Sequence, residues 1–256
     1  MAGYVENKGA KRVKTALLFL FIGLFVLVGF FLYRELAGRK TDKEELEKIQ
    51  EEMHSQETVP VAEGEILPQF ASLHEENPDL SGWLSIPGTA LDHPVMYKQN
   101  DNDYYLSHDF YGKDSKSGLL VLDKRCMPDA SGNNILIHGH NMKDGSCFGT
   151  LGEYVSEAFY LKHPTILFDT LYEEREYEIM SVFRSSVNAE DKNFKYYEYI
   201  NIDNEEDFRI YYLNVKANSL YETGVFASYG DELITLSTCE YSTENGRLVV
   251  IGRRRN

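Results

Sequence analysis

The feature that most constrains this chain is an uncharged apolar run near its N-terminus. Residues 16–33, "ALLFLFIGLFVLVGFFLY", are 18 consecutive residues without a charged side chain. As a helix rising about 1.5 Å per residue, this run would cover roughly 27 Å, close to the hydrocarbon thickness of a bilayer. We therefore expect residues 16–33 to form a transmembrane signal anchor, and the rest of the chain to fold outside the hydrocarbon.

A cleaved signal peptide is the alternative interpretation of this run. Such peptides usually have a shorter apolar region, and the nearby sequence "ELAG" places Glu35 where cleavage needs a small side chain. We therefore favour an uncleaved anchor. Lysine and arginine are similarly frequent on both flanks, so charge orients the anchor poorly. Because residues 1–15 are too few to fold, we expect them to be a cytoplasmic tail and the large C-terminal part to be extracellular.

The formal charge of the 256-residue chain is -15. The residues before the apolar run carry a net positive charge, so the excess of acidic residues lies in the part of the chain that folds. An acidic body repels the phosphate backbone, which excludes nucleic acid as a partner. With 43% hydrophobic residues, the chain can bury one core of good size.

Residues 34–65 are expected to be a polar stalk and linker. Within them the stretch 40–58 is almost wholly polar, with Leu46, Ile49 and Met53 as its apolar residues at helical spacing. This pattern indicates a solvated helix. Pro60 and Gly64 then break it, so we expect the folded domain to cover residues 66–256.

The domain reads as short β-like runs separated by turn residues, a pattern typical of a barrel or a sandwich. About eight candidate strands lie within residues 82–89, 93–98, 117–123, 133–141, 164–170, 175–186, 231–238 and 247–254. A short amphipathic helix is expected before Pro78. A second helix is expected over 204–217, where Asn204 is a plausible cap and apolar residues follow at i, i+3, i+4 and i+7. The three arginines at 253–255 are expected to be a solvated tail.

The chain has three cysteines, Cys126, Cys147 and Cys239, so at least one thiol is free. We expect the first two to be inert packing. Cys239 ends the apolar run "ELITLSTC", and antiparallel pairing with "RLVVIGRR" across residues 240–246 would make Cys239 and Arg247 close partners. A guanidinium stays protonated and cannot act as a base. It can favour a thiolate, or donate hydrogen bonds to an oxyanion formed when that thiolate attacks a carbonyl.

A nucleophilic cysteine also needs a group that exchanges protons. In "NNILIHGHNM", His138 and His140 point the same way, and His140 lies nearer the strand end. We therefore choose His140 and expect His138 to be a half-buried neighbour. The alternative is a zinc site made by His138, His140 and Cys147, since H-x-H on a strand can chelate zinc. No fourth ligand stands out, so we expect neither a metal nor another cofactor.

Three motifs occur in the order and spacing of a known enzyme family. They are "GHNM" at residues 139–142, "TLSTC" at residues 235–239, and an arginine eight positions after the cysteine in "GRLVV". This combination resembles the sortases of Gram-positive bacteria. The "GHNM" form, the helix before the last strands and the opening "NPDLSGWLSIPGTALDHPVMYKQNDNDYYLSHDFYGK" resemble class B, and the resemblance covers residues 66–256 and the anchor.

The resemblance implies a mainly β fold, a closed eight-stranded β-barrel with N-terminal helices and an added helix matching 204–217. It implies a membrane-anchored cysteine transpeptidase that cleaves an NPxT-type sorting signal after threonine, holds the acyl group as a thioester and passes it to an amine of a cell-wall precursor such as lipid II. The family's catalytic residues match His140, Cys239 and Arg247, and its substrate-contacting positions match Asn102, Leu106, Ser237 and Glu240.

Two other functions remain open from the residues alone. One is a papain-like cell-wall cysteine peptidase, although such enzymes generally place cysteine before histidine, the reverse of the order here. The other is a non-catalytic surface binding module displayed on a membrane stalk.

Overall fold

The computed structural model describes residues 8–56, 61–62, 64–188, 190, 193–240 and 245–255, with side chains described from residue 14 onward except at 35. The chain divides into two compact units between Glu44 and Glu45. In the first unit, helix α1 (Lys8–Ser55) carries the apolar run, whose side chains are exposed. Within the described residues, α1 is the one helix long and apolar enough to cross a membrane.

The last turns of α1 belong to the second unit and contribute to its core. Ile49 and Met53 are 2% and 5% exposed and pack in a hydrophobic cluster with Trp83. The Gln50 amide nitrogen Nε2 donates to the backbone oxygen of Asp92 at 2.6 Å. This differs from the expectation of a wholly solvated stalk over 40–58, because two apolar side chains four residues apart suffice to bury one face of a helix.

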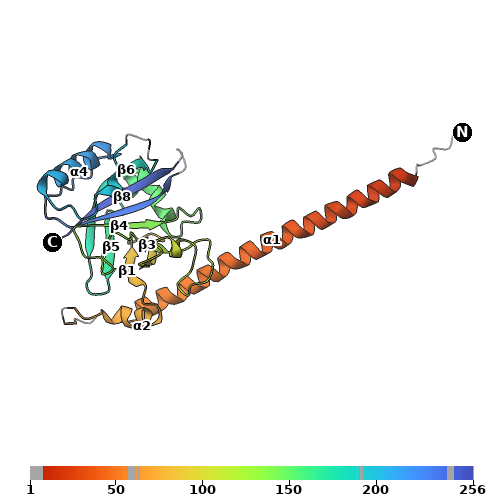
Figure 1. Cartoon of the computed structure of the whole chain (residues 1–256), viewed down its shortest axis with the longest axis horizontal. Helices are drawn as coiled ribbons and strands as arrows, with labels where there is room; N and C mark the ends of the chain where they lie inside the picture. Colours follow the sequence, from red (N-terminus) through yellow and green to blue (C-terminus); the bar gives the residue numbers. More distant parts are fainter. Residues whose placement is uncertain are drawn as a thin grey trace. The chain divides into compact units, whose positions relative to one another are not determined.

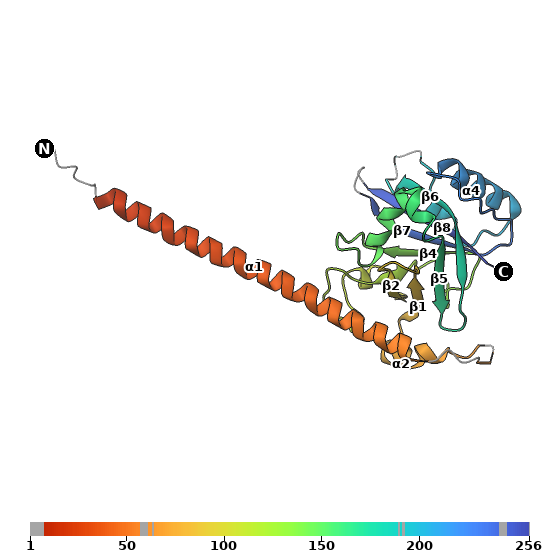
Figure 2. The same ribbon diagram turned by 180° about the vertical axis from the view of Figure 1, so that it is seen from behind.

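The second unit is a closed β-barrel (Figures 1 and 2). Its strands are β1 (Leu80–Ser85), β2 (Asp92–Met96), β3 (Leu120–Leu122), β4 (Asn134–Gly139), β5 (Thr165–Thr170), β6 (Glu176–Ser186), β7 (Leu233–Glu240) and β8 (Gly246–Arg254). They follow the order β1-β2-β3-β4-β7-β8-β6-β5. The pairs β2–β3 and β4–β7 are parallel, and the others are antiparallel. The predicted fold class is therefore confirmed.

Helices and 3-10 segments precede and connect the strands. They are α2 (Pro68–Glu76), α3 (Glu157–Tyr160), α4 (Glu205–Asn218) and the 3-10 segments η1 (Tyr104–Leu106), η2 (Phe148–Val155) and η3 (Tyr196–Glu198). Helix α4 begins as expected, because the Asn204 side-chain oxygen accepts from the Asp207 N–H at 2.9 Å. It lies against β6 (Figure 1), where the Ser181 hydroxyl donates to the Val215 carbonyl oxygen at 3.1 Å. The predicted helix before the last strands is confirmed.

Strand β7 is buried along most of its length. Residues 233–238 are all buried, and exposure begins only at Cys239 and Glu240. One face of β7 is covered in part by η3, since the Tyr196 hydroxyl lies 2.6 Å from the Ser237 hydroxyl. Burial on both faces leaves the end of the strand as its accessible part.

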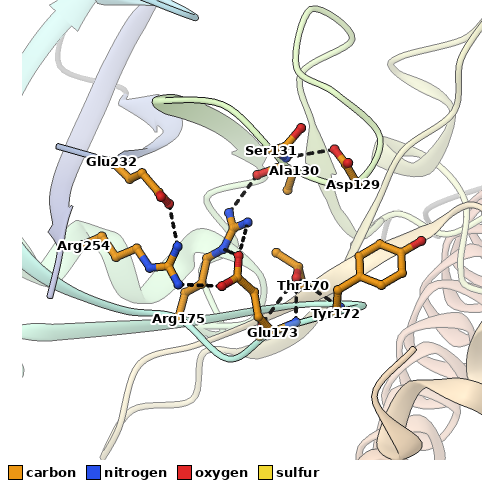
Figure 3. Close-up of polar contacts among 9 residues, drawn as sticks. All are labelled: Asp129, Ala130, Ser131, Thr170, Tyr172, Glu173, Arg175, Glu232 and Arg254. Atoms are coloured by element: carbon orange, nitrogen blue, oxygen red, sulfur yellow. Dashed lines mark hydrogen bonds and ion pairs between the residues drawn. The ribbon is translucent and has the colours of Figure 1, made fainter. Parts of the chain in front are cut away.

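The C-terminal arginines are paired rather than solvated. Figure 3 shows Arg254 between two carboxylates, Glu232 at 2.7 Å and Glu173 at 2.6 Å. Arg253 donates to Glu178 at 2.8 Å, and Arg255 contacts the same carboxylate at 3.1 Å. The expectation of a solvated tail was therefore wrong. Arg253 and Arg254 are the last residues of β8, and Arg255 follows them. Strand β8 lies between β6 and β7, so the three guanidinium groups are close to glutamates of neighbouring segments.

We expect Glu173→Gln to destabilise the fold, because Glu173 joins two arginines (Figure 3). Arg175 is only 8% exposed, and it also donates to the Ala130 carbonyl oxygen at 2.8 Å. Removing the carboxylate leaves a mostly buried guanidinium short of its counter-charge. Because Glu173 itself is partly exposed, we expect a loss of about 1–2 kcal/mol in the free energy of unfolding, measured by urea denaturation.

The matched control is Glu206→Gln, which breaks an ion pair with Arg209 on the exposed face of α4. Exposed pairs of this kind are screened by solvent and contribute little to stability, so we expect a much smaller loss than for Glu173→Gln. Equal effects of the two substitutions would show that the Glu173 cluster does not support the barrel.

A second stability prediction concerns Asp169 on β5. Burial, and then the nearby charge of Glu174, raise the pKa of Asp169 to about 6. The folded protein therefore holds this proton more tightly than the unfolded chain does, so the contribution of Asp169 to stability is largest at low pH and is lost as pH rises from 3.8 to about 6.

We expect Asp169→Asn to raise the free energy of unfolding by ~1–2 kcal/mol near neutral pH, since the amide carries no charge to bury. The gain should shrink towards about pH 4. Urea denaturation at the two pH values checks this, with the exposed Asp203→Asn as control. A gain that is the same at both pH values would contradict the assigned cause.

Candidate active site

The barrel brings three sequence motifs together at one rim. Strands β4 and β7 are parallel, with Gly139 opposite Thr238, so the next residues, His140 just after β4 and Cys239 within β7, lie at the same level of the barrel. Strand β8 starts at this rim and runs antiparallel to β7, with Arg247 opposite Cys239. The predicted pairing of Cys239 with Arg247 is therefore confirmed. The Thr238 hydroxyl donates to the Gly139 carbonyl oxygen at 2.9 Å and fastens the two strand ends.

Cys239 differs from the other two cysteines of the chain, all of which the structure describes. Cys126 and Cys147 are 4% and 1% exposed, whereas Cys239 is half-buried. Burial raises the pKa of the Cys126 thiol to about 11. The Cys147 thiol donates to the Ser117 carbonyl oxygen at 3.2 Å. Cys239 is thus the thiol that a substrate can reach, and the two others are held in packing, as expected from the sequence.

His140 lies in the loop that follows β4 and is fixed by contacts on several sides. Its ring nitrogen Nε2 is 2.8 Å from the backbone oxygen of Leu106, on η1. Its own carbonyl oxygen accepts from the Phe148 N–H at 2.9 Å. The next residue, Asn141, donates from its side-chain nitrogen to the Cys239 carbonyl oxygen at 2.8 Å. The loop that carries His140 is therefore tied directly to the strand that carries Cys239.

His138 has a different role, as the sequence suggested. It is half-buried, and its Nε2 lies 2.9 Å from Asp123, which also binds Arg125 at 2.8 Å through two nitrogens. Burial alone would raise the pKa of Asp123, but the hydrogen bonds from Arg125 and His138 outweigh it and hold that pKa well below its usual range.

The alternative zinc site would need His138, His140 and Cys147 to share one ion. In the structure each has a different partner: Asp123, Leu106 and Ser117 respectively. Among the residues that the structure describes, no three histidine, cysteine or acidic side chains gather as a ligand set. The structure therefore does not bring His138, His140 and Cys147 together around one point.

Arg247 is half-buried, and one guanidinium nitrogen donates to the Gly246 carbonyl oxygen at 2.9 Å. Its other strand neighbour is Ser185 on β6. Nearby, Tyr196 is buried against Ser237, and burial raises the pKa of its hydroxyl to about 12, so it stays a neutral hydrogen-bonding group. Sequence reasoning selected neither Tyr196 nor Asn141. Only the position of Asn141, directly after His140 in "GHN", offered a signal.

The four predicted substrate-contacting residues are spread around this centre. The Leu106 backbone meets His140, Ser237 lies two residues before Cys239 and is 2% exposed, and Glu240 follows Cys239. The Glu240 carboxylate is 3.8 Å from Arg184. The structure thus brings Leu106, Ser237 and Glu240 to the rim.

Asn102 lies four residues before Leu106, in the connection between β2 and β3. Its side-chain oxygen is enclosed and accepts no hydrogen bond from the part of the chain that the structure describes.

Known proteins are similar to this chain in sequence and in fold. Residues 84–255 match the family model of the sortase domain. Sortase B of Listeria monocytogenes is 32% identical over 91% of this chain and 92% of its own. Sortase B of Staphylococcus aureus is 27% identical over 95% of this chain and 97% of its own.

Solved structures agree with the sequence matches. The crystal structure of sortase B from Bacillus anthracis in complex with AAEK1 superposes with a TM-score of 0.75 at 27% identity, covering 86% of this chain and 98% of that one. A Staphylococcus aureus sortase B–substrate complex gives a TM-score of 0.73, also at 27% identity, covering 86% of this chain and 99% of that one.

These matches support neither of the two alternatives left open by the residues, a papain-like peptidase and a non-catalytic binding module. The sortase domain covers well over half of the chain, and the relatives align over nearly all of it. The chain therefore belongs to the sortase family, in which it is a class B cysteine transpeptidase.

Proposed function

We propose that this enzyme cleaves an NPxT-type sorting signal after its threonine and transfers the acyl group to an amine of a cell-wall precursor of the lipid II type. The observation that carries the proposal is the rim itself, where a reachable thiol, Cys239, is paired with Arg247 and level with His140. Two Sortase B structures to which this chain is similar add support, one a substrate complex and one complexed with Gly3.

In the first half of the reaction, the Cys239 thiolate attacks the threonine carbonyl carbon. The carbonyl oxygen becomes an oxyanion, and the Arg247 guanidinium donates hydrogen bonds to it. The C–N bond then breaks as imidazolium His140 gives its proton to the departing amine nitrogen. A thioester between Cys239 and the threonine acyl group remains, and His140 is neutral.

In the second half, an incoming amine attacks the thioester carbonyl and gives a proton to neutral His140. The C–S bond breaks, Cys239 leaves as thiolate, and an amide is formed. Water competes with the amine for the thioester. The site favours the amine by holding it close to the carbonyl and by keeping water out.

The substrate is held along the β2–β3 connection and the end of β7. Asn102 lies in this connection, and Leu106 follows it on the segment whose backbone meets His140. Ser237 lies beneath the nucleophile, and Glu240 flanks it with a carboxylate. We assign these four residues to binding and not to bond making.

The membrane holds the enzyme where its substrates are. The apolar run at residues 16–33 of α1 is the anchor, residues 1–15 form the cytoplasmic tail, and the barrel is extracellular. A partner that is itself membrane-bound, as a lipid-linked precursor is, would then share the same surface.

A labelling experiment tests the chemistry directly. An NPxT peptide with an electrophile in place of the threonine carbonyl is incubated with the full chain in detergent, and the adduct is mapped by peptide mass spectrometry. We expect one adduct, on Cys239. Modification of Cys126 or Cys147, or equal labelling by a scrambled peptide, would contradict the proposal. A panel of NPxT variants with amine acceptors then identifies the motif and the acceptor by product mass.

A further inference from the structure

The contact between His140 and Leu106 fixes the position of a proton. The Nε2 atom of His140 is 2.8 Å from the Leu106 carbonyl oxygen, and a carbonyl oxygen has no proton to give. Nε2 must therefore carry the hydrogen and donate it. A neutral imidazole carries one ring proton, so Nδ1 bears the lone pair.

We propose that the Leu106 carbonyl oxygen holds His140 in the Nε2–H tautomer, so that Nδ1 exchanges the proton during acyl transfer, and that Gly118 is a positioning residue that lets this oxygen reach His140. The proposal rests on the proposed function for the role of His140. It gives Leu106 a backbone role that is separate from contact between its side chain and a substrate.

The backbone around Leu106 is held by neighbours on both sides. The Leu106 N–H donates to the Asp103 carbonyl oxygen at 3.0 Å, and the Leu119 N–H donates to the Tyr105 carbonyl oxygen at 2.7 Å. Tyr105 is 4% exposed, and its hydroxyl donates to Asp79 at 2.9 Å. The Leu106 carbonyl therefore has little freedom to turn away from His140.

Gly118 packs directly against this carbonyl. A Cβ atom at position 118 would lie 2.4 Å from the Leu106 oxygen and 2.7 Å from the Tyr105 oxygen, closer than real Cβ contacts. Both oxygen atoms belong to backbone that is already hydrogen-bonded, so moving either of them would weaken existing hydrogen bonds. The φ of Gly118 is also +56°, which side chains rarely adopt. A side chain here would push the acceptor oxygen away from the His140 ring.

Gly118 is also connected to the loop on the other side of His140. Its carbonyl oxygen lies 3.5 Å from the Cys147 thiol, and its N–H donates to the Ser115 hydroxyl at 3.0 Å. Cys147 immediately precedes Phe148, whose N–H binds the His140 carbonyl oxygen. The segment that supports the Leu106 oxygen thus also supports the loop that carries His140.

The proton balance of the reaction agrees with this assignment. Imidazolium His140 has a hydrogen on each nitrogen, and when Nδ1 gives its proton to the departing amine, the Nε2–H tautomer remains and keeps its bond to Leu106. The incoming amine later returns a proton to Nδ1. The ring need not rotate between the two steps, and the hydrogen on Nε2 never leaves.

The tautomer can be measured without any activity assay. Long-range ¹H–¹⁵N spectra of the full chain, labelled at its histidines and held in detergent at a pH where the ring is neutral, distinguish the two tautomers. His140→Gln assigns the signal. We expect the Nε2–H pattern for His140. An Nδ1–H pattern would overturn the proposal, and this outcome does not depend on whether Gly118→Ala folds.

The role of Gly118 is tested with two alanine substitutions. Gly118→Ala and the control Gly224→Ala both place alanine at positive φ, +56° and +75°, but nothing lies within 4 Å of a Cβ at position 224. We expect Gly118→Ala to lower kcat ~10- to 100-fold and to give a mixture of the two His140 tautomers. Gly224→Ala is expected to keep kcat within about 2-fold of the parent and to keep the parent's tautomer.

A folded Gly118→Ala variant with the parent's kcat and tautomer would refute the positioning role. Failure of the proposed function looks different. If the His140→Ala variant transferred the acyl group as fast as the parent, His140 would have no catalytic role. The tautomer measured for His140 in the parent protein would still stand.

Discussion

Replacing Cys239 by alanine is expected to abolish both thioester formation and acyl transfer. Cys239 is half-buried at the exposed end of β7, whereas the two other thiols are enclosed in the core. Ser237, two residues before Cys239, does not replace it, because its hydroxyl is buried and bound to Tyr196. A loss of at least ~10⁴-fold in kcat/KM is expected, as when a covalent nucleophile is removed. Intact mass after incubation with an NPxT peptide measures the acyl-enzyme.

The matched control is Cys126→Ala, which removes a buried thiol of the same chain. Cys126 accepts a weak hydrogen bond from the Leu136 N–H at 3.4 Å, so a small loss of stability is expected but no loss of thioester. Cleavage that survives Cys239→Ala would mean that another residue attacks the carbonyl, and the chemistry proposed for the rim would have to be abandoned.

Replacing Arg247 by lysine is expected to lower kcat/KM by ~10²-fold or more, with the acyl-enzyme formed slowly rather than lost. Lysine keeps the positive charge opposite Cys239 but loses the planar guanidinium, which presents several donors in a fixed geometry. Removing one hydrogen-bond donor to an oxyanion typically lowers the rate by about 10²- to 10³-fold. Single-turnover kinetics of acylation measures it.

Arg209→Lys serves as the control, since Arg209 lies on the exposed face of α4 in a pair with Glu206. It is expected to leave acylation unchanged. Near-normal turnover by Arg247→Lys would show that charge alone suffices at this position and that the guanidinium does not hold the oxyanion.

Much of the fold could be predicted from the sequence because its signals are local. All eight candidate strands are strands in the barrel, since each apolar run is bounded by turn residues. The helix expected over 204–217 is α4, and its cap is Asn204 as expected. The pairing of Cys239 with Arg247 also followed from local information, because two strands joined by a short loop are usually antiparallel neighbours.

The remaining features depend on contacts between distant segments. Ile49 and Met53 look like isolated apolar residues in a polar stretch until Trp83 and its neighbours are placed against them. The arginine cluster needs Glu173 and Glu232, which lie 81 and 22 residues before Arg254. The acceptor for His140 is the backbone oxygen of Leu106. Every residue has such an oxygen, so the amino-acid sequence does not indicate which one accepts from His140.

The parallel pairing of β4 with β7 has a consequence for when this enzyme becomes competent. The two strands are joined across about a hundred residues, as the contact between Asn141 and Cys239 at a separation of 98 positions shows. Long connections close late during folding, because their entropy must be overcome before the distant contacts form. His140 precedes Cys239 and Arg247 in the chain, so the histidine is present before the strands that carry its two partners. The site is therefore complete only when β7 and β8, the last two strands, have joined the barrel.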